Sequence, residues 1–130
     1  MVVGIDAPEP GEAERIDRLF HALADPTRRD IVRVVLHSEE SVSALAQRYP
    51  MSFAAVQKHV AVLERAELVR KRRQGREQLV SGDIETLRSV NRLLDQYEAI
   101  WRDRIGRMDE ILAETGDEIE TETTSKERNR

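Results

Sequence analysis

The chain has 130 residues, no cysteine and a net charge of −4 at pH 7. This length suits one domain with its own core, and the lack of cysteine excludes disulfides and thiolate metal sites. No apolar stretch approaches the roughly 18 residues that span a bilayer, and the start lacks a signal-peptide pattern, so we expect a cytoplasmic protein with no membrane partner.

The first predicted segment, residues 1–13, contains prolines, glycines and acidic residues and is expected to form a disordered leader. From residue 14 apolar residues recur at helical spacing, which predicts a helix over 14–24. Its apolar side consists of Ile16, Leu19, Phe20 and Leu23. Asp25 and Pro26 then start a second helix, because aspartate caps helices and proline suits the first turn. The inward residues of this helix, which reaches about His37, are Ile31, Val34 and Val35.

Two further helices, over 42–48 and 52–66, are predicted on either side of a short turn. Ser41 and Ser52 are their caps. Pro50 ends the first of the pair, because proline disfavours helical geometry in the residue before it. The predicted buried stripe of the second helix is Val56, Val60 and Leu63. A short helix, a turn and a second helix form the helix-turn-helix unit, whose second helix enters the major groove of DNA.

A hairpin follows, with strands over 68–73 and 76–81 around Gly75, which permits the positive φ of a tight turn. Five Lys or Arg residues lie within 70–76, and such a cluster repels itself unless it meets a polyanion. Residues 52–80 carry a net charge of +4, while the negative charge is concentrated at the ends of the chain. A local positive field is enough to attract phosphate.

Asp83 caps a last long helix that is predicted to reach about Leu112. The ordered domain therefore covers 14–112, and residues 113–130 are expected to form an acidic disordered tail. The predicted fold is mainly helical with a small β-hairpin. Its order of four helices, two strands and a last helix is that of a winged helix-turn-helix.

The last helix carries an apolar seam in which members recur every seven residues. Part of this seam, together with the first helix, is predicted to bind a second copy of the chain. The predicted interface residues are Ile16, Leu19, Phe20, Leu94, Tyr97, Trp101, Ile105 and Met108. The alternative is that the seam belongs entirely to the core of a single chain.

The outer face of helix 52–66 is the predicted surface for duplex DNA. Gln57 suits adenine, Lys58 suits guanine or phosphate, and Ser52 with the free amides of the helix start suits a phosphate. The arginines of the hairpin suit the flanking backbone or the minor groove. The predicted DNA contacts are Ser52, Ala54, Gln57, Lys58, Ala61, Arg65, Arg70, Arg72, Arg73 and Arg76.

Two alternative interpretations do not involve specific DNA binding. A basic run is often only a solvated surface, and a winged helix can serve as a protein–protein interaction module without specific DNA binding. An apolar or mixed wing would favour the second alternative, and the wing here is basic. We do not expect an enzyme, because the sequence has no glycine-rich phosphate loop, no cysteine nucleophile and no histidine paired with serine or aspartate in a motif.

Two stretches resemble the ArsR/SmtB-type regulators. The segment SALAQRYPMSFAAVQKHVAVLERAELV, followed by RRQGR, looks like their recognition segment and wing, and FHALADPTRRDIVRVVL looks like the start of their second helix. The resemblance implies a homodimeric repressor that binds an inverted repeat near its own promoter, usually with an effector that lowers DNA affinity. We expect the bound dimer to repress by excluding RNA polymerase. The chain departs from the family at Gln57, often serine there, and at Glu67, often glycine, which must adopt another geometry or bear strain.

The resemblance also bears on metals. Ser41 and Ser43 stand where metal-sensing members carry a cysteine pair, and residues 83–112 contain no histidine. We therefore predict a member without a regulatory metal or cofactor and leave any effector open. His59 matches a family histidine that is expected to pack or form a hydrogen bond and not to bind a metal. A carboxylate-only site across a dimer is the alternative, from Asp95, Glu98 or Asp103.

Overall fold

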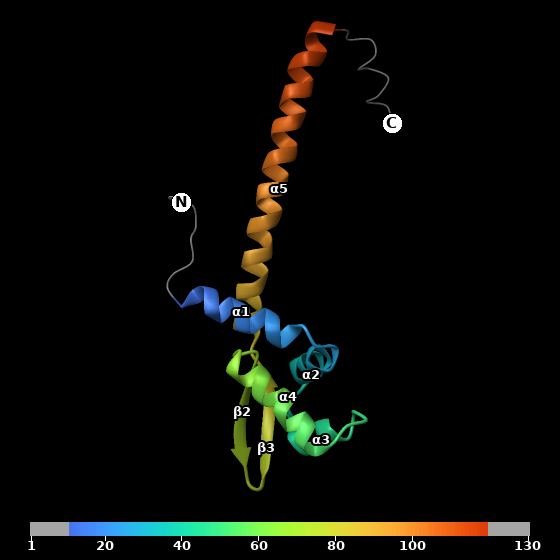
Figure 1. The fold of residues 1–130 in the computed structure, drawn as a ribbon, viewed down its shortest axis with the longest axis vertical. Coiled ribbons are helices and arrows are strands. Elements are labelled where there is room, and N and C mark those ends of the chain that lie inside the picture. Colours follow the sequence, from blue (N-terminus) through green and yellow to red (C-terminus); the bar gives the residue numbers. More distant parts are fainter. Residues whose placement is uncertain (1–10, 120–130) are drawn as a thin grey trace. The chain divides into compact units, whose positions relative to one another are not determined.

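The structure, a computed structural model, describes residues 11–119, with side chains described as far as Thr115. The chain forms two compact units, of which the first ends at Val90 and the second begins at Asn91. The elements in chain order (Figure 1) are α1 (Glu12–Leu23), α2 (Pro26–His37), β1 (Glu40–Ser41), α3 (Val42–Ala46), α4 (Phe53–Arg65), β2 (Val69–Gln74), β3 (Glu77–Gly82) and α5 (Ile84–Ile119).

This order confirms the predicted winged helix-turn-helix fold, with one element added. The two-residue strand β1 pairs antiparallel with β3, so the hairpin becomes a three-stranded sheet in the order β1-β3-β2. A strand of two residues carries no periodic signal, and its partner lies far along the chain, so β1 could not be predicted from the sequence. The added strand ties the start of α3 to the wing.

The two ends of the ordered region differ from the prediction. The last helix ends at Ile119 and not near Leu112, so residues 113–119 are helical where a tail was predicted. Ala113 and Glu114 are good helix formers, which explains the extension. At the other end α1 starts at Glu12, with Gly11 before it at a φ of 91°. The remaining parts of the predicted leader and tail, 1–10 and 120–130, lie outside the described residues.

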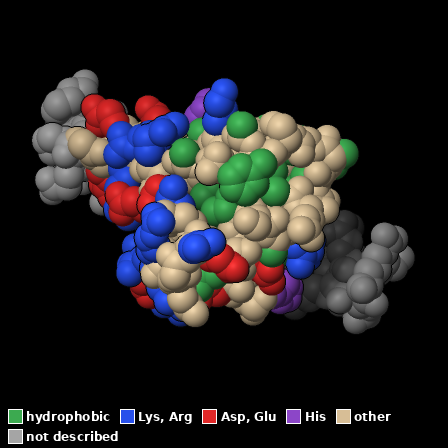
Figure 2. All heavy atoms as spheres, turned by 90° about the horizontal axis from the view of Figure 1, so that it is seen from below, with side chains coloured by type: hydrophobic (Ala, Val, Ile, Leu, Met, Phe, Trp, Pro, Cys, Tyr) green, Lys and Arg blue, Asp and Glu red, His purple; other side chains and the backbone are tan. Residues whose placement is uncertain are grey.

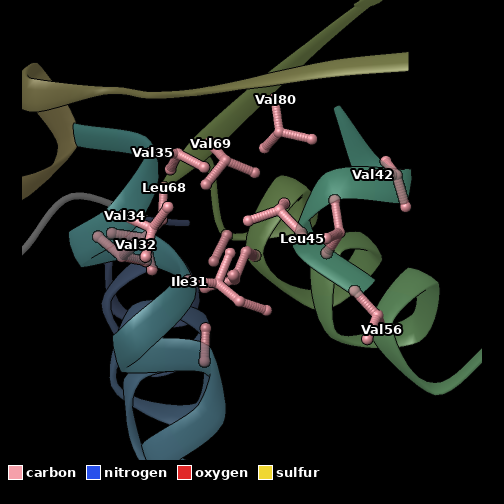
Figure 3. Packing of buried hydrophobic residues seen from close by; sticks show 14 of the residues in the cluster. Ile31, Val32, Val34, Val35, Val42, Leu45, Val56, Leu68, Val69 and Val80 are labelled. Atoms are coloured by element: carbon pink, nitrogen blue, oxygen red, sulfur yellow. The ribbon is translucent and has the colours of Figure 1, made fainter. Parts of the chain in front are cut away.

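The core of the first unit lies between the helices and the sheet. Side chains of α2, α3, α4 and the strands converge there (Figure 3), and the predicted stripe of α4 is buried in it. Ile31, Leu45 and Leu63 have no measurable exposure. The sheet approaches α2 closely at Gly82, where an added Cβ would lie 2.6 Å from the Leu36 side chain. Among the described helices, none combines the length and apolar character needed to cross a membrane.

The junction between α1 and α2 is fixed by the ADPTRR segment. Asp25 caps α2 as predicted, because its carboxylate accepts the Arg28 N–H at 3.0 Å. Nε of Arg28 donates to the Ala22 carbonyl at 2.8 Å, and Arg29 donates to the Leu23 carbonyl at 2.8 Å. Both arginines thus satisfy carbonyls that the end of α1 leaves free. We conclude that this segment orients α1 against α2.

Candidate nucleic-acid interface

The turn between α3 and α4 is anchored to α2. Tyr49 Oη donates to a carboxylate oxygen of Asp30 at 2.7 Å, and Arg33 donates to the other oxygen. The Tyr49 hydroxyl and the Arg33 guanidinium hold the pKa of Asp30 below its ordinary value. Burial, together with the hydrogen bond to Asp30, raises the pKa of Tyr49 to about 12. The anchor sets the position from which α4 starts.

Helix α4 presents one face to the core and the opposite face to solvent. Its start is capped as predicted, because Ser52 Oγ accepts the N–H of Ala55 at 3.1 Å. Of the predicted DNA contacts on this helix, Ala61 is half-buried, and the exposed ones are Ser52, Ala54, Gln57, Lys58 and Arg65. His59 lies on a flank, with Nδ1 at 3.3 Å from a guanidinium nitrogen of Arg28. This contact holds α4 against α2.

The end of α4 leads directly into the wing through Glu67, which has a positive φ of 64°. The Leu68 N–H donates to the Leu63 carbonyl at 3.0 Å, and the Glu67 N–H donates to the Glu64 carbonyl at 2.9 Å. These two bonds form a Schellman motif, in which glycine is usual at the position of Glu67. Of the two outcomes predicted for Glu67, the structure has the strained one. The geometry places Leu68 and Val69 in the core.

The wing is the hairpin of β2 and β3, which turns at Gly75 with a positive φ of 63°. Alternate residues of a strand share a face, so Val69, Lys71 and Arg73 lie on one face of β2. Val69 is buried in the core, and Nζ of Lys71 lies 3.3 Å from a carboxylate oxygen of Glu64 on α4. Arg73 therefore lies on the side of the sheet that faces α4, whereas Arg70 and Arg72 lie on the other side.

Ion pairs divide the cations of the wing into two groups. Two nitrogens of Arg72 donate to Glu39 at 3.0 and 2.8 Å, and Arg70 donates to Asp83 at 3.0 Å. The hydrogen bonds from Arg72 lower the pKa of Glu39. Burial raises the pKa of Asp83, but the hydrogen bonds from Arg70 and from backbone N–H groups outweigh it, and the net shift is downward.

The second group consists of cations without an acidic partner within the described residues. Arg73 and Arg76 belong to it on the wing, and Lys58 and Arg65 belong to it on α4. Figure 2 views the wing end of the molecule and shows Lys and Arg side chains along one side, interspersed with Asp and Glu side chains and next to a hydrophobic patch. Within residues 11–119, the outer face of α4 and the wing thus carry cations without an acidic partner, next to the small side chains of Ala54 and Ala61.

The exposed apolar residue at the start of α4 is absent from the predicted contacts. Phe53, the first residue of the helix, has 47% of its surface exposed. It lies four residues before Gln57, so the two share a flank of α4. The available signal was an aromatic residue directly after a serine cap and outside the buried stripe.

The predicted dimer residues fall into three groups. Leu19 is buried in the core of its own chain with 1% exposure, so its assignment to an interface is wrong: no side-chain surface is left for a partner. On α1, Ile16 is half-buried and Phe20 is exposed. The third group consists of the predicted interface residues of the second unit, all of which are exposed: Leu94, Tyr97, Trp101, Ile105 and Met108.

The prediction that the chain lacks a regulatory metal stays a prediction. No group of three or more histidine, cysteine or carboxylate side chains suited to a metal occurs in the described part of the chain. Ser41, at the place of a family cysteine, caps α3 by accepting the Ala44 N–H at 3.0 Å. Glu98 and Asp103, two of the alternative ligands, form ion pairs with Arg102 and Arg107 on their own helix.

Comparison with known proteins identifies the family. A helix-turn-helix domain model matches residues 23–72. The HTH-type transcriptional regulator Rv2034 of Mycobacterium tuberculosis is 33% identical over 102 residues, which are 78% of this chain and 92% of that protein. The structure of an ArsR-like transcriptional regulator from Rhodococcus sp. RHA1 superposes with a TM-score of 0.69 at 30% identity, over 78% of this chain and 96% of that chain.

A third comparison supports the fold alone. It is with Mb0332 of Mycobacterium bovis, described as a homodimeric winged helix-turn-helix DNA-binding domain, with a TM-score of 0.57 at 21% identity over 69% of this chain and 90% of that chain. The two relatives at 30% identity or more are covered almost in full. The chain belongs to the ArsR family of winged helix-turn-helix transcriptional regulators, which are DNA-binding proteins and not enzymes.

Proposed function

We propose that the chain is a homodimeric repressor that binds an inverted-repeat operator and excludes RNA polymerase from it. The observation that carries the proposal is a set of cations that have no acidic partner in the described part of the chain: Lys58 and Arg65 on α4, and Arg73 and Arg76 on the wing. Such a set attracts the phosphates of a duplex, and the open face of α4 suits the major groove.

Individual contacts follow from side-chain chemistry. Gln57 pairs with an adenine, and Lys58 contacts a guanine or a phosphate. Ala54 and Ala61 let the helix approach closely, while Ser52 and the first amides of α4 hold a phosphate. Arg73 and Arg76 contact the flanking backbone or the minor groove.

Arg70 and Arg72 are weaker contacts in this proposal. Their guanidinium groups already donate to Asp83 and Glu39, so each must exchange a carboxylate for a phosphate. Arg73 and Arg76 have no carboxylate partner within residues 11–119 and need no such exchange.

A dimer is proposed from the exposed apolar residues of the second unit. Tyr97 and Trp101 are exposed by more than half, and aromatic residues of this size are common anchors of interfaces. A relative with the same fold is described as homodimeric. Two recognition helices related by twofold symmetry, about 34 Å apart, read two half-sites of an inverted repeat.

The proposed operator lies upstream of the chain's own gene, as the family resemblance implies. A regulator of this kind acts where the chromosome lies, and we propose the cytoplasm as its location. We further propose that its response, if an effector exists, does not use a metal.

Footprinting on the upstream DNA tests the proposal, with and without divalent metal ions. We expect a protected region with twofold symmetry that metals leave unchanged, and we expect Lys58→Ala to weaken the protection. Arg92→Ala is the matched control, because Arg92 on α5 is exposed, has no acidic partner within the described residues, as Lys58 has none, and lies where no DNA contact is proposed. Asymmetric or absent protection, or equal binding by the Lys58→Ala variant and the wild type, would argue against the operator contacts proposed here.

A further inference from the structure

We propose that Phe53 recognises the C5-methyl group of a thymine in the major groove of each operator half-site. This inference rests on the proposed function, because it requires α4 to lie in that groove. It adds a specificity residue that the charged surface does not explain. The group that Phe53 would recognise is the methyl group on C5 of a pyrimidine, which thymine and 5-methylcytosine share.

The position of Phe53 carries the argument. It is the first residue of α4, next to the exposed Ala54, and 47% of its surface is exposed. Val56, only three residues later, is completely buried. The first turn of α4 therefore packs against the core through Val56, whereas the Phe53 side chain stays largely outside it. An aromatic ring left in water gains free energy when a partner covers it.

The start of α4 is also the part of the helix that comes nearest to DNA in a helix-turn-helix. Ser52 accepts the Ala55 N–H, and the first N–H groups of the helix have no acceptor within it. A phosphate at these groups seats the helix start against the backbone. The exposed Phe53 then lies close to the bases beside that phosphate.

Among the groups on the floor of the major groove, the thymine methyl is the apolar one, and apolar side chains contact it. Phe53 and Gln57 are four residues apart on one helix flank, which places their Cβ atoms about 5–6 Å apart. Successive bases are about 3.4 Å apart along a strand. The thymine read by Phe53 therefore lies one or two base pairs from the adenine read by Gln57.

Binding assays on a methyl-deleted duplex test this inference. The probe is a duplex that the full-length wild-type chain enriches from a random library, and each thymine is replaced in turn by deoxyuridine, which lacks the methyl. We expect one position per half-site at which the wild type loses about fourfold in affinity, the effect of one buried methyl. The Phe53→Ala variant should bind the two duplexes equally well.

Two further measurements test whether the methyl group itself is recognised and whether the effect is specific to Phe53. At the sensitive position, 5-methylcytosine paired with guanine should bind more tightly than cytosine paired with guanine if the methyl itself is read. Ile84→Ala is the matched control, because Ile84 is also the first residue of a helix and is 49% exposed. This variant should keep the wild-type sensitivity. Circular dichroism shows whether both variants keep their helix content.

The outcomes are distinguishable from a failure of the proposed function. If the library yields no enriched duplex, the operator proposal fails first. If the wild type binds an enriched duplex but is insensitive to every deoxyuridine, Phe53 reads no methyl. If Phe53→Ala keeps the sensitivity, another side chain reads the methyl. If Phe53→Ala changes no DNA affinity at all, the ring serves another partner, such as a protein, and the inference is overturned.

Discussion

Replacing Arg73 by alanine is expected to lower both the affinity for duplex DNA and the dependence of that affinity on salt. Arg73 lies on the side of β2 that faces α4 and has no acidic partner within the described residues. Its guanidinium is therefore available to a phosphate. Arg72, the neighbour on the opposite face, donates twice to Glu39, so the Glu39–Arg72 pair carries no net charge to the DNA.

The magnitude follows from counterion release. One phosphate contact adds about 0.9 to the slope of log affinity against log salt concentration. The proposed dimer presents Arg73 twice, so Arg73→Ala should lower the slope by about 1.8. Between about 50 and about 200 mM salt, the ratio of the variant and wild-type dissociation constants should then fall by roughly tenfold.

The double variant Glu39→Gln/Arg72→Gln is the matched control, because it removes an ion pair from the wing without changing the net charge. We expect its slope to fall by less than that of Arg73→Ala, because Arg72 must first give up Glu39 to contact a phosphate. Fluorescence anisotropy of a labelled non-specific duplex over a salt series measures all three slopes, and thermal unfolding shows whether the wing is intact. A wild-type slope for Arg73→Ala, or a loss in the double variant as large as in Arg73→Ala, would refute the division of the wing cations.

Trp101→Ala should shift the chain towards monomer without loss of helix, because the ring is 56% exposed within its own chain; a dimeric mass by light scattering at low micromolar concentration would contradict this. Glu67→Gly should be more stable than Glu67→Ala by about 1 kcal/mol in urea unfolding, since glycine removes the strain of a left-handed backbone. Both variants lose the long ion pair between Arg15 and Glu67, with 3.8 Å between its nitrogen and oxygen, so this loss cancels in the comparison. Equal stabilities of the two variants would show that the backbone at position 67 is not strained. Tyr49→Phe should cost about 1 kcal/mol at neutral pH, a value kept low because Asp30 is partly solvated. The difference in unfolding free energy between Tyr49→Phe and the wild type should shrink as pH falls below 3.8, because the pKa of Asp30 is lowered in the folded state. It should also shrink as pH rises from 10.0 towards 12, because the pKa of Tyr49 is raised in the folded state. A difference that persists at both extremes of pH in urea titrations would contradict the assigned hydrogen bond.

Much of the site was predictable because its signals are local. Asp25, Ser41 and Ser52 cap the helices that they were predicted to cap. A cap needs only a short polar side chain within one turn of the amides it serves, so a few residues decide it. The same holds for Gly75, whose positive φ is a property of the turn itself.

Other features depend on partners that are far apart along the chain. Neither Glu39 nor Arg72 indicates by its neighbours that the two form an ion pair, and Tyr49 gives no local sign of its bond to Asp30. The sequence therefore suggested equal roles for all the wing arginines. Only the tertiary structure distinguishes, among the described residues, the paired wing arginines from the unpaired ones, because the Glu39–Arg72 pair forms only when β2 and the residue before β1 are brought together by the sheet.

The amino-acid sequence alone determined the helices, the hairpin, the open face of α4 and the family, because periodicity, capping and turn chemistry act over a few residues. Only the tertiary structure decided that β1 joins the sheet, that Leu19 belongs to the core of its own chain and that Phe53 is left exposed. Exposure is set by what packs against a side chain from other elements, and a helical pattern specifies the direction of a residue but not its neighbour.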